Sequence, residues 1–233
     1  MKVAAIIYSR LGSKRLKNKA LIKIGSKKLL EHVITNTKKI QSIDKIILAT
    51  TKLKEDEKLI EVAQKSKISY FQGHESNVLK RTVDCLQKYK FDYFLRVCGD
   101  RIFFDHEKID KIVNSIKKKI NNKFDLVTSN RNKKVDQGLT IEIISTSGIL
   151  KVLSLNKRIT KYDQEHITNN FYKYKKKYNL ENIKLPKYFF LNLKYTIDNE
   201  IDVKRAKYIL KNNSYKKFSE IVKRNLKWER NEK

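Results

Sequence analysis

Glycine, proline and cysteine are scarce in this chain, and their scarcity limits the classes of protein to which it can belong. Of the 233 residues, 6 are glycine, 2 are cysteine and 1, Pro186, is proline. No Gly/Ser-rich or Pro-rich stretch divides the chain, so it offers no candidate linker between domains. Cys85 and Cys98 have neither the C-x-x-C spacing of a zinc or redox site nor the dense, even pattern of a secreted scaffold. We therefore expect one domain, residues 1–233, in a reducing compartment.

Long hydrophobic runs are absent as well. No uninterrupted apolar stretch approaches the roughly 18 residues that a membrane-spanning helix needs. Met1 leads directly into the apolar run Val3–Tyr8, without the small-residue cleavage site of a secretory signal. A chain of this length buries roughly 70% of the surface that its unfolded form exposes, which is enough for one substantial core. We expect a soluble, cytoplasmic protein that does not contact a membrane.

Acidic residues are few relative to basic ones, and the formal net charge is +29. Such a balance suggests a polyanionic partner, nucleic acid above all. However, 44 of the basic residues are lysine and 10 are arginine, and residues with A/T-rich codons (Lys, Ile, Asn, Tyr) far outnumber those with G/C-rich codons. The lysines also extend from Lys2 to Lys233, whereas a binding face should be local. We favour a bias in base composition over a nucleic-acid footprint as the source of the charge.

The scarcity of glycine makes each glycine informative. In a chain that otherwise avoids this residue, glycine is expected where the backbone needs a positive φ or closely approaches another group. The candidate positions are Gly12, Gly25, Gly73, Gly99, Gly138 and Gly148.

Hydrophobic periodicity alternates between strand and helix spacing along the first half of the chain. It predicts strands at 3–8, 45–49, 68–71 and 93–97, and helices at 29–40, 54–66, 77–89 and 107–120. This alternation indicates an α/β fold with a mostly parallel sheet and helices on both faces. After Phe124 the pattern changes, and it predicts strands at 126–128, 139–144 and 189–197 and helices at 147–155, 163–178 and 201–226. The simplest interpretation is one domain with two halves, 1–122 and 123–233, the second carrying a β-containing subregion.

The segment after the first predicted strand, Ser9–Leu21, has the composition of a phosphate-binding loop. It contains Gly12, the small hydroxyl residue Ser13 and several cations. Open α/β sheets bind ligands beyond the carboxyl ends of their strands, and backbone N–H groups together with guanidinium groups can enclose a polyphosphate. The segment matches neither the Walker pattern nor G-x-G-x-x-G. A solvated basic loop in a lysine-rich protein is the alternative.

Two carboxylates follow predicted strands. Asp100 comes directly after Arg96-Val97-Cys98-Gly99 and suits a divalent cation, because Mg²⁺ typically uses one or two carboxylates together with substrate phosphates. Asp198 ends another predicted strand, and no structural role explains it well. Asp202, by contrast, lies in the first turn of the next predicted helix and fits a capping residue better than a ligand.

Seven short blocks of the chain occur in the order of one known family. They are Ser9–Leu21, Gly25–Ile34, Ala49–Thr51, Gly73–Arg81, Arg96–Asp100, Glu165–Thr168 and Ile197–Asp202. Through them the whole chain resembles the cytidylyltransferases that activate sugar acids as CMP-sugars, especially the spore-coat polysaccharide branch beside the acylneuraminate and KDO enzymes. The resemblance implies a Rossmann-like, three-layer α/β/α fold of the nucleotide-diphospho-sugar transferase type. It also implies a homodimer that pairs through a small β-containing subregion.

The resemblance further implies roles for individual residues. Those expected to bind the nucleotide are Arg10, Gly12, Ser13, Arg15, Lys19, Thr50, Gly73, Asn77 and Arg81. Among these, Arg10, Arg15 and Lys19 grip the triphosphate and, with Asp100, are the expected catalytic residues. Asp100 and Asp198 correspond to the two aspartates that hold the catalytic Mg²⁺. The acceptor-sugar region includes Glu142, Glu165 and His166, although His166 equally fits a packing role.

The chain departs from the family pattern at two points. The central proline-glycine of the opening loop is Lys17-Asn18 here, and asparagine tolerates the left-handed conformation that would preserve the turn. After Asp100 the family has a small or acidic residue and then proline, whereas this chain has Arg101-Ile102. A cation beside a metal ligand could weaken Mg²⁺ binding or assist with pyrophosphate, and the sequence leaves both alternatives open.

Together these features predict an enzyme that transfers CMP from CTP to an acidic sugar, nonulosonate or KDO-like, and releases pyrophosphate, for surface polysaccharide synthesis. Such a displacement needs positioning and charge neutralisation more than a protein nucleophile. A transferase of the same fold with another nucleotide or a non-sugar acceptor is the second hypothesis. A basic nucleic-acid-binding protein is the third, favoured by charge and by the alternation Tyr172-Lys173-Tyr174-Lys175.

If base composition explains the charge, duplex DNA should bind weakly and without sequence preference. Its affinity should collapse between low and physiological salt, because such binding comes from counterion release. Fluorescence anisotropy with labelled duplexes across a salt series measures this. A dissociation constant below about 10⁻⁸ M at physiological salt, the range of specific complexes, would instead favour the nucleic-acid hypothesis.

Overall fold

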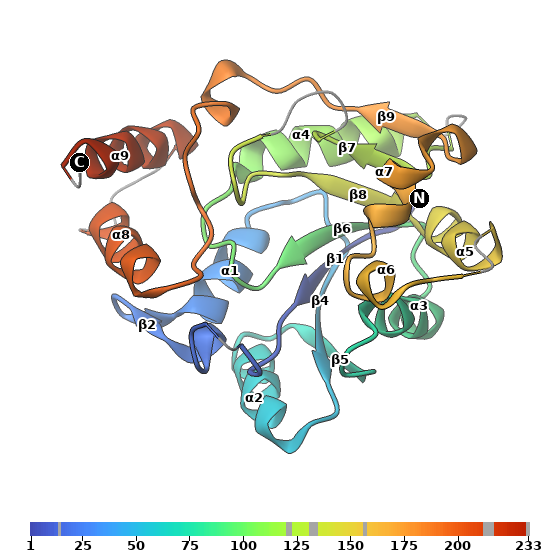
Figure 1. The fold of residues 1–233 in the computed structure, drawn as a ribbon, viewed down its shortest axis with the longest axis horizontal. Helices are drawn as coiled ribbons and strands as arrows, with labels where there is room; N and C mark the ends of the chain where they lie inside the picture. The colour runs from blue at the N-terminus through green and yellow to red at the C-terminus, as the bar shows by residue number, and fades with distance from the viewer. Residues whose placement is uncertain (14, 120–122, 131–134, 156–157, 212–216, 232–233) are drawn as a thin grey trace.

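One mixed sheet organises the described part of the chain. The computed structural model describes residues 1–13, 15–119, 123–130, 135–155, 158–211 and 217–231. Within these ranges, seven strands form a sheet of order β5-β4-β1-β6-β8-β7-β9, and a two-stranded hairpin lies apart from it. Figure 1 shows the sheet through the middle of the molecule, with the two chain ends on opposite sides.

Four parallel strands form one half of the sheet. They are β1 (Val3–Tyr8), β4 (Lys45–Thr51), β5 (Ser69–Gly73) and β6 (Tyr93–Cys98). Tyr8, the last residue of β1, is in register with Ala49 of β4 on one side and with Cys98 of β6 on the other. The carboxyl ends of these strands therefore lie together, at what we call the carboxyl edge of the sheet. The segments that follow β1, β4 and β6 meet there.

The second half of the sheet mixes strand directions. β8 (Glu142–Ser145) is antiparallel both to β6 and to β7 (Leu126–Thr128), and β9 (Leu180–Asn182) is parallel to β7. Because β8 pairs directly with β6, residues of the second half of the chain continue the sheet that the first half begins. Among the described residues, the remaining strands are the short hairpin pair β2 (Lys23–Ile24) and β3 (Lys27–Lys28).

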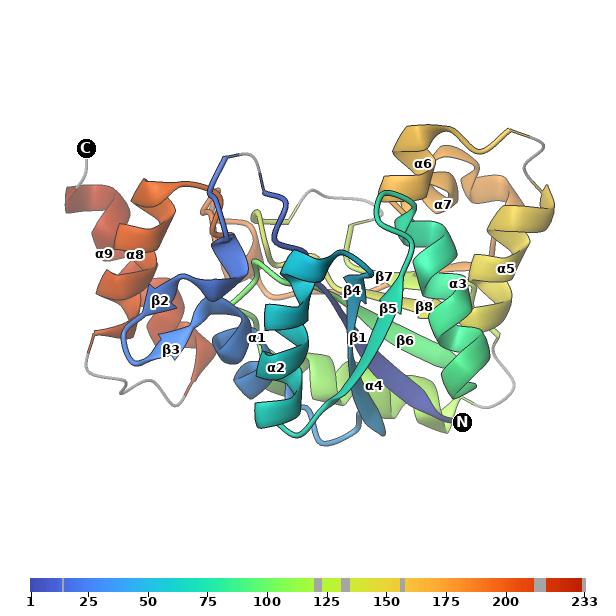
Figure 2. The ribbon, with the colours of Figure 1, turned by 90° about the horizontal axis from the view of Figure 1, so that it is seen from below.

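Helices cover both faces of the sheet. Side chains alternate along β1, so that Ala5 and Ile7 belong to one core cluster and Ala4 and Ile6 to the other. The first cluster includes buried residues of α1 (Leu29–Thr37), α2 (Glu57–Lys65) and α4 (His106–Lys118). The second includes those of α3 (Val78–Tyr89), α5 (Thr146–Leu155) and α7 (Asn169–Lys173). Figure 2 shows α3 and α5 on one side of the strands and α1 and α2 on the other.

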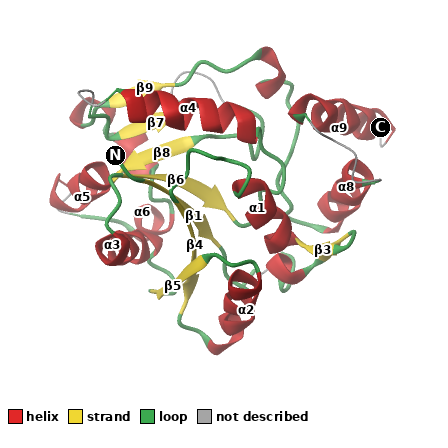
Figure 3. Cartoon of the chain, turned by 180° about the vertical axis from the view of Figure 1, so that it is seen from behind, coloured by secondary structure: helices red, strands yellow, loops and turns green. Residues whose placement is uncertain are grey.

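The chain ends in two helices, α8 (Glu200–Leu210) and α9 (Phe218–Asn231), which pack against each other next to the hairpin. Figure 3 shows this pair at one end of the molecule. A shorter helix, α6 (Lys161–Glu165), lies close to α3. No helix within the described ranges is long and apolar enough to cross a membrane. Several helices begin at a side chain that accepts a backbone N–H of the first turn, as the capping residues Asn77, Asp105, Thr160 and Asn199 do.

The predicted fold class is confirmed, and the strands and helices of the first half lie close to their predicted positions, with Ile120 outside the described residues. Three predictions for the second half were wrong. Residues 189–197 do not form a strand: Asn192 has a left-handed backbone (φ 58°), and the segment pairs through one isolated bridge, Gln137 with Lys194. The helix predicted at 163–178 is split into α6 and α7, because His166 leaves the helical conformation (ψ 77°) and Ile167 turns into the core.

The third correction concerns the helix predicted at 201–226. It is two helices, since α8 ends at Leu210 and α9 begins at Phe218, with residues 212–216 outside the described part. The dimerisation subregion stays a prediction.

Gly148 allows α5 to approach the sheet. A Cβ built at this position would lie 2.6 Å from the carbonyl oxygen of Asp125, directly before β7. We expect Gly148→Ala to lower the free energy of unfolding by about 1–3 kcal/mol, because backbone must shift to relieve the overlap. Gly12→Ala is the matched control, since a Cβ there meets nothing within 4 Å. Urea denaturation of both variants measures the difference, and equal stabilities would contradict the packing role of Gly148.

Candidate functional site

A pocket of about 590 Å³ opens at the carboxyl edge of the sheet. Its walls come from the end of β1 and the loop after it, from the start of α3, from the end of β6, and from the residues around the end of α6. We call it the central pocket. It brings together nine of the residues predicted from the sequence, namely Arg10, Gly12, Ser13, Arg15, Lys19, Arg81, Asp100, Glu165 and His166.

Lys19 joins two carboxylates that are far apart in the sequence. Its Nζ atom lies 2.9 Å from Oδ2 of Asp100 and 3.0 Å from Oδ1 of Asp198. Burial acts to lower the pKa of Lys19, but the charges and hydrogen bonds of Asp100 and Asp198 outweigh it and raise the pKa. The ammonium group therefore stays charged between the two carboxylates. The predicted proximity of Asp100 and Asp198 is present in the structure, with a cation between them.

Asp198 is surrounded by donors. Arg15 and Lys194 lie 3.4 Å from its oxygens, and the hydroxyl of Thr196 donates to Oδ2 at 2.8 Å. Burial acts to raise the pKa of Asp198, but the hydrogen bonds from Lys19 and Thr196 and the charges of Lys19 and Lys194 bring it down to about 2. Asp198 is thus an anion at all moderate pH values.

The start of α8 fixes the backbone on which Asp198 lies. The N–H groups of Asp198 and Asn199 both donate to Oδ2 of Asp202, at 2.7 and 3.2 Å, and Asn199 accepts the N–H of Asp202 in return. This reciprocal capping box confirms the capping interpretation of Asp202. The backbone N–H of Ile197 also donates to the carbonyl of Asp100 at 3.2 Å, which ties the two aspartate segments together.

The donor set suits one kind of metal ion. Among the described residues, no group of three or more histidine, cysteine, aspartate or glutamate side chains could hold a metal by itself. Asp100 and Asp198 nevertheless direct one oxygen each toward a common cation, the ammonium of Lys19. Two converging carboxylates match the protein share of a Mg²⁺ site that substrate phosphates complete. The residues present therefore fit the predicted metal.

Two backbone features shape the loop after β1. Gly99 lies against the end of β1, where its N–H donates to the carbonyl of Tyr8 at 2.8 Å and a Cβ would lie 2.8 Å from that oxygen. Asn18 has the left-handed conformation expected for the altered turn, with φ 53° and ψ 31°. Gly12 differs from Gly99, because a Cβ on it would meet open space rather than protein atoms. Its lack of a side chain leaves room in the central pocket.

The residues predicted to bind the nucleotide from outside the loop after β1 lie in different surroundings. Arg81 lines the central pocket, and Gly73 makes room for it, since a Cβ at Gly73 would lie 2.7 Å from Cγ of Arg81. Thr50 is fully buried and donates to Oδ2 of Asp56 at 3.1 Å. Asn77 caps α3 and lines a separate groove beside α5. Arg81 is thus placed at the pocket with Gly73 behind its side chain, while Thr50 and Asn77 are occupied by contacts with the protein.

The predicted acceptor residues are also separated. Glu142 is buried, and its carboxylate accepts a hydrogen bond from Arg96 and another from Tyr172, both at 2.8 Å. Burial acts to raise the pKa of Glu142, but Arg96, Arg101 and Tyr172 lower it overall. Glu142 therefore supports Arg96, which itself lines the central pocket.

Glu165 and His166 lie at the end of α6, on the wall of the central pocket opposite the loop after β1. Glu165 forms an ion pair with Arg10 at 3.7 Å, in which both side chains are largely exposed. The ring of His166 packs on Tyr162 with centroids 4.2 Å apart. His166 thus has the packing contact and the pocket position that the sequence left as alternatives.

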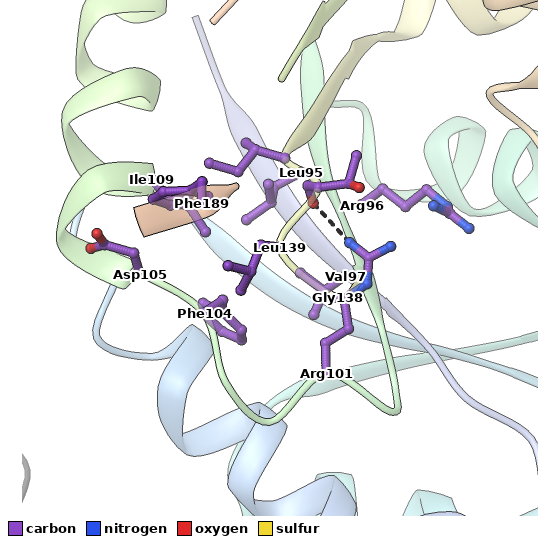
Figure 4. Close-up of a pocket in the computed structure, with 12 residues that line it drawn as sticks. Leu95, Arg96, Val97, Arg101, Phe104, Asp105, Ile109, Gly138, Leu139 and Phe189 are labelled. Atoms are coloured by element: carbon purple, nitrogen blue, oxygen red, sulfur yellow. Dashed lines mark hydrogen bonds between the residues drawn. The ribbon is translucent and has the colours of Figure 1, made fainter. Parts of the chain in front are cut away.

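The departure from the family pattern after Asp100 has a structural explanation. Arg101 donates from Nη1 to the carbonyl of Thr140 at 2.8 Å and lines a small, mostly apolar pocket with Leu139 and Phe104. Figure 4 shows its guanidinium group directed toward this segment and Arg96 extending away from it. The guanidinium group of Arg101 is therefore held by the segment before β8, rather than lying on the wall of the central pocket.

Seven residues that line the central pocket were not among the predicted site residues. Three of them, Tyr8, Arg96 and Cys98, line it from the ends of β1 and β6. Arg96 points to the same face of β6 as Phe94, which packs on the α3 side. Along the predicted strand 93–97, Arg96 falls on the same face as the large apolar residue Phe94. A cation on the apolar face of a strand is the signal that could have identified Arg96.

Comparison with known proteins gives a consistent result. A sequence profile described as cytidylyltransferase matches residues 4–230. An uncharacterized protein of Methanocaldococcus jannaschii is 34% identical over 191 residues, which cover 82% of this chain and 72% of that protein. Its description adds no activity.

Solved structures share the fold at lower identity. A cytidylyltransferase from Leptospira borgpetersenii has a TM-score of 0.88 at 23% identity, covering 96% of this chain and 93% of its own. A CMP:2-keto-3-deoxy-manno-octonic acid synthetase, solved with CTP, has a TM-score of 0.68 at 12% identity, covering 92% of this chain and 100% of its own. A putative glucose-1-phosphate thymidylyltransferase from Bacillus anthracis has a TM-score of 0.63 at 16% identity, covering 93% of this chain and 98% of its own.

The low pKa of Asp198 predicts a pH-dependent contribution to stability. Because the pKa is about 2 in the folded protein and ordinarily 3.8, the ionised carboxylate stabilises the fold above pH 3.8, and this stabilisation is lost as the pH falls toward 2. We expect wild type to exceed Asp198→Asn in free energy of unfolding by a constant amount at neutral pH and by less below pH 3.8. Urea denaturation across the pH range measures this. A difference that stays constant in acid would contradict the ionised role of Asp198.

Proposed function

The chain belongs to the cytidylyltransferase family, and we propose that it transfers CMP from CTP to an acidic sugar, with release of pyrophosphate, for surface polysaccharide synthesis. The observation that carries this proposal is the bridge from Lys19 to Asp100 and Asp198 beside the glycine-containing loop after β1. The proposal is supported by cations that lie next to these two carboxylates, of which Asp100 lines the central pocket.

The charge of the central pocket supports an anionic nucleotide. Cationic side chains on its walls outnumber the acidic ones, which are Asp100 and Glu165. We assign the triphosphate to the loop side, where the lining cations are Arg10, Arg15 and Lys19. The base and ribose then lie toward α3, where Arg81 is buried with two hydrogen bonds to the carbonyls of His74 and Glu75.

We propose Mg²⁺ as the cofactor, held by Asp100 and Asp198. When bound, the ion supplies neutralisation of charge on the phosphate oxygens. The triphosphate would offer the ammonium group of Lys19 further anionic partners beside Asp100 and Asp198. Arg15, which lies 3.4 Å from Asp198 and is largely exposed, is placed to follow the phosphates without losing a buried contact.

The proposed reaction is a single displacement. An acceptor hydroxyl forms a bond to the α-phosphorus of CTP, the bond from that phosphorus to the bridging oxygen breaks, and the hydroxyl proton passes to solvent. Pyrophosphate departs with the bridging oxygen. Arg10, Arg15 and Lys19 bind and orient the phosphates and favour the charge that develops on the leaving group. No covalent bond to the protein is needed.

We place the acceptor between Asp100 and the end of α6. Arg96, held by Glu142, offers a positive charge for an acidic sugar, and Arg10, Glu165 and His166 border the same space.

We also propose a homodimer. Leu139, Ile141, Ile143 and Ile144 are buried in the core, so a dimer interface in this region would use other residues.

Nucleotide selectivity tests the proposal. With a panel of acidic sugars and Mg²⁺, pyrophosphate release from CTP should be at least about tenfold faster than from ATP or GTP, because a site built for hydrogen bonds to one base leaves polar groups unpaired with another. Asp100→Asn should reduce the rate at least about 100-fold, the scale of losing one electrostatic group in the transition state. A coupled pyrophosphate assay measures both. Equal rates with purine triphosphates would contradict the assignment of CTP as the nucleotide. Turnover only with neutral acceptors would contradict the assignment of an acidic sugar as the acceptor.

A further inference from the structure

We infer that Asp56 is a positioning residue that sets the triphosphate loop after β1, a role that rests on the proposed function of that loop. Asp56 is fully buried and lies just before α2, outside the lining of the central pocket. Its Oδ1 atom accepts the backbone N–H of Leu11 at 2.8 Å. Leu11 lies between Arg10 and Gly12, which both line the pocket.

Asp56 ends a short 3-10 helix, Lys54–Asp56, that leads directly into α2. An aspartate directly before a helix usually accepts an N–H of the first turn. Here the side chain makes no such hydrogen bond to α2 and turns instead toward the loop and the end of β4. Figure 2 shows the start of α2 beside the loop that leaves β1. The carboxylate thus makes long-range contacts in place of the local one.

The second oxygen of Asp56 is held by β4. Oδ2 accepts the hydroxyls of Thr50 and Thr51 and, at 3.3 Å, the backbone N–H of Thr51. These residues belong to the Ala49–Thr51 block of the sequence, and Thr50 is one of those predicted to bind the nucleotide. Because both threonines are fully buried, they act on the nucleotide through Asp56 and Leu11 rather than by contact.

The hydrogen bond from Leu11 to Asp56 is shorter than the backbone hydrogen bond between the loop and β4. The N–H of Ser9 reaches the carbonyl of Ala49 at 3.4 Å, whereas the N–H of Leu11 reaches Oδ1 of Asp56 at 2.8 Å. The N–H of Ser13 donates to the carbonyl of Leu11 at 2.7 Å, so the turn that carries Gly12 closes on Leu11 itself. The side chain of Leu11 is buried as well. Fixing Leu11 therefore fixes the pocket residues on both sides of it.

A carboxamide cannot replace the carboxylate here. Asp56 faces a backbone N–H with each oxygen, Leu11 with Oδ1 and Thr51 with Oδ2. Asparagine has one acceptor oxygen and one NH₂ group, so in either orientation an N–H donor would face another N–H donor. We expect Asp56→Asn to release Leu11 or Thr51 and to loosen the triphosphate loop.

The test compares CTP with CMP, which keeps the base, the ribose and one phosphate. By isothermal titration calorimetry in the presence of Mg²⁺, Asp56→Asn should weaken CTP binding by about tenfold, the scale of one charge-assisted hydrogen bond, and CMP binding by less than about threefold. A merely structural role would weaken both ligands alike. Wild-type protein that does not bind CTP would overturn the proposed function, whereas equal CTP affinity of wild type and Asp56→Asn would overturn the role of Asp56.

The chain offers a matched control at the other end of β1. Asp44 also accepts a backbone N–H, that of Val3, through Oδ2 at 2.6 Å. Asp44→Asn should lower the melting temperature and leave the ratio of CTP to CMP affinity unchanged. If Asp56→Asn does not fold, Thr51→Val removes one donor to the same carboxylate while keeping the backbone. It should weaken CTP by about threefold and CMP less, and an unchanged ratio would overturn the inference.

Discussion

The bridge from Lys19 to Asp100 and Asp198 is the interaction on which the arrangement of the site depends. It joins the loop after β1, the end of β6 and the segment before α8, which belong to both halves of the chain. Charges removed from water are costly unless each has a partner. The side chain of Lys19 is 14% exposed and that of Asp198 8%, and each has further partners, Asp100 for Lys19 and Lys194 and Thr196 for Asp198. The bridge beside the central pocket therefore forms only when all three segments are in place.

The first half of the fold was predictable because its signals are local. Each strand of the parallel half is followed by a helix whose apolar spacing is visible in the sequence, and the helix starts at Asn77 and Asp105 carry their own capping residues. The second half depends on contacts between distant residues. Residues 189–197 have the composition of a strand, but they are held by hydrogen bonds to Asp136 and bent at Asn192, which no local pattern indicates.

The site shows the same division. Resemblance to the family grouped Arg10, Arg15, Lys19, Asp100 and Asp198 correctly as neighbours, because each lies in a recognisable block. The resemblance could not distinguish a residue that lines the pocket from one that holds a lining residue in place. Thr50 proves to be hydrogen-bonded to Asp56, and Glu142 to Arg96. Asp56 itself was missed, since it falls in the first turn of the helix predicted at 54–66, where an acidic residue is ordinary. Distinguishing these cases requires the partner of each polar atom, which is known only in the folded chain.

The capping box at the start of α8 links ligand binding to chain architecture. Asp202 holds the backbone of Asp198, and Lys194 and Arg205 in turn hold Asp202 at 2.5 and 2.9 Å. Whatever occupies the space around Lys19 and Asp198 consequently adds its binding free energy to the docking of α8 on the first half, by thermodynamic linkage. Binding of the nucleotide and docking of the C-terminal helices therefore stabilise each other. A chain cut between its two halves would reassemble more firmly around its substrate than without it.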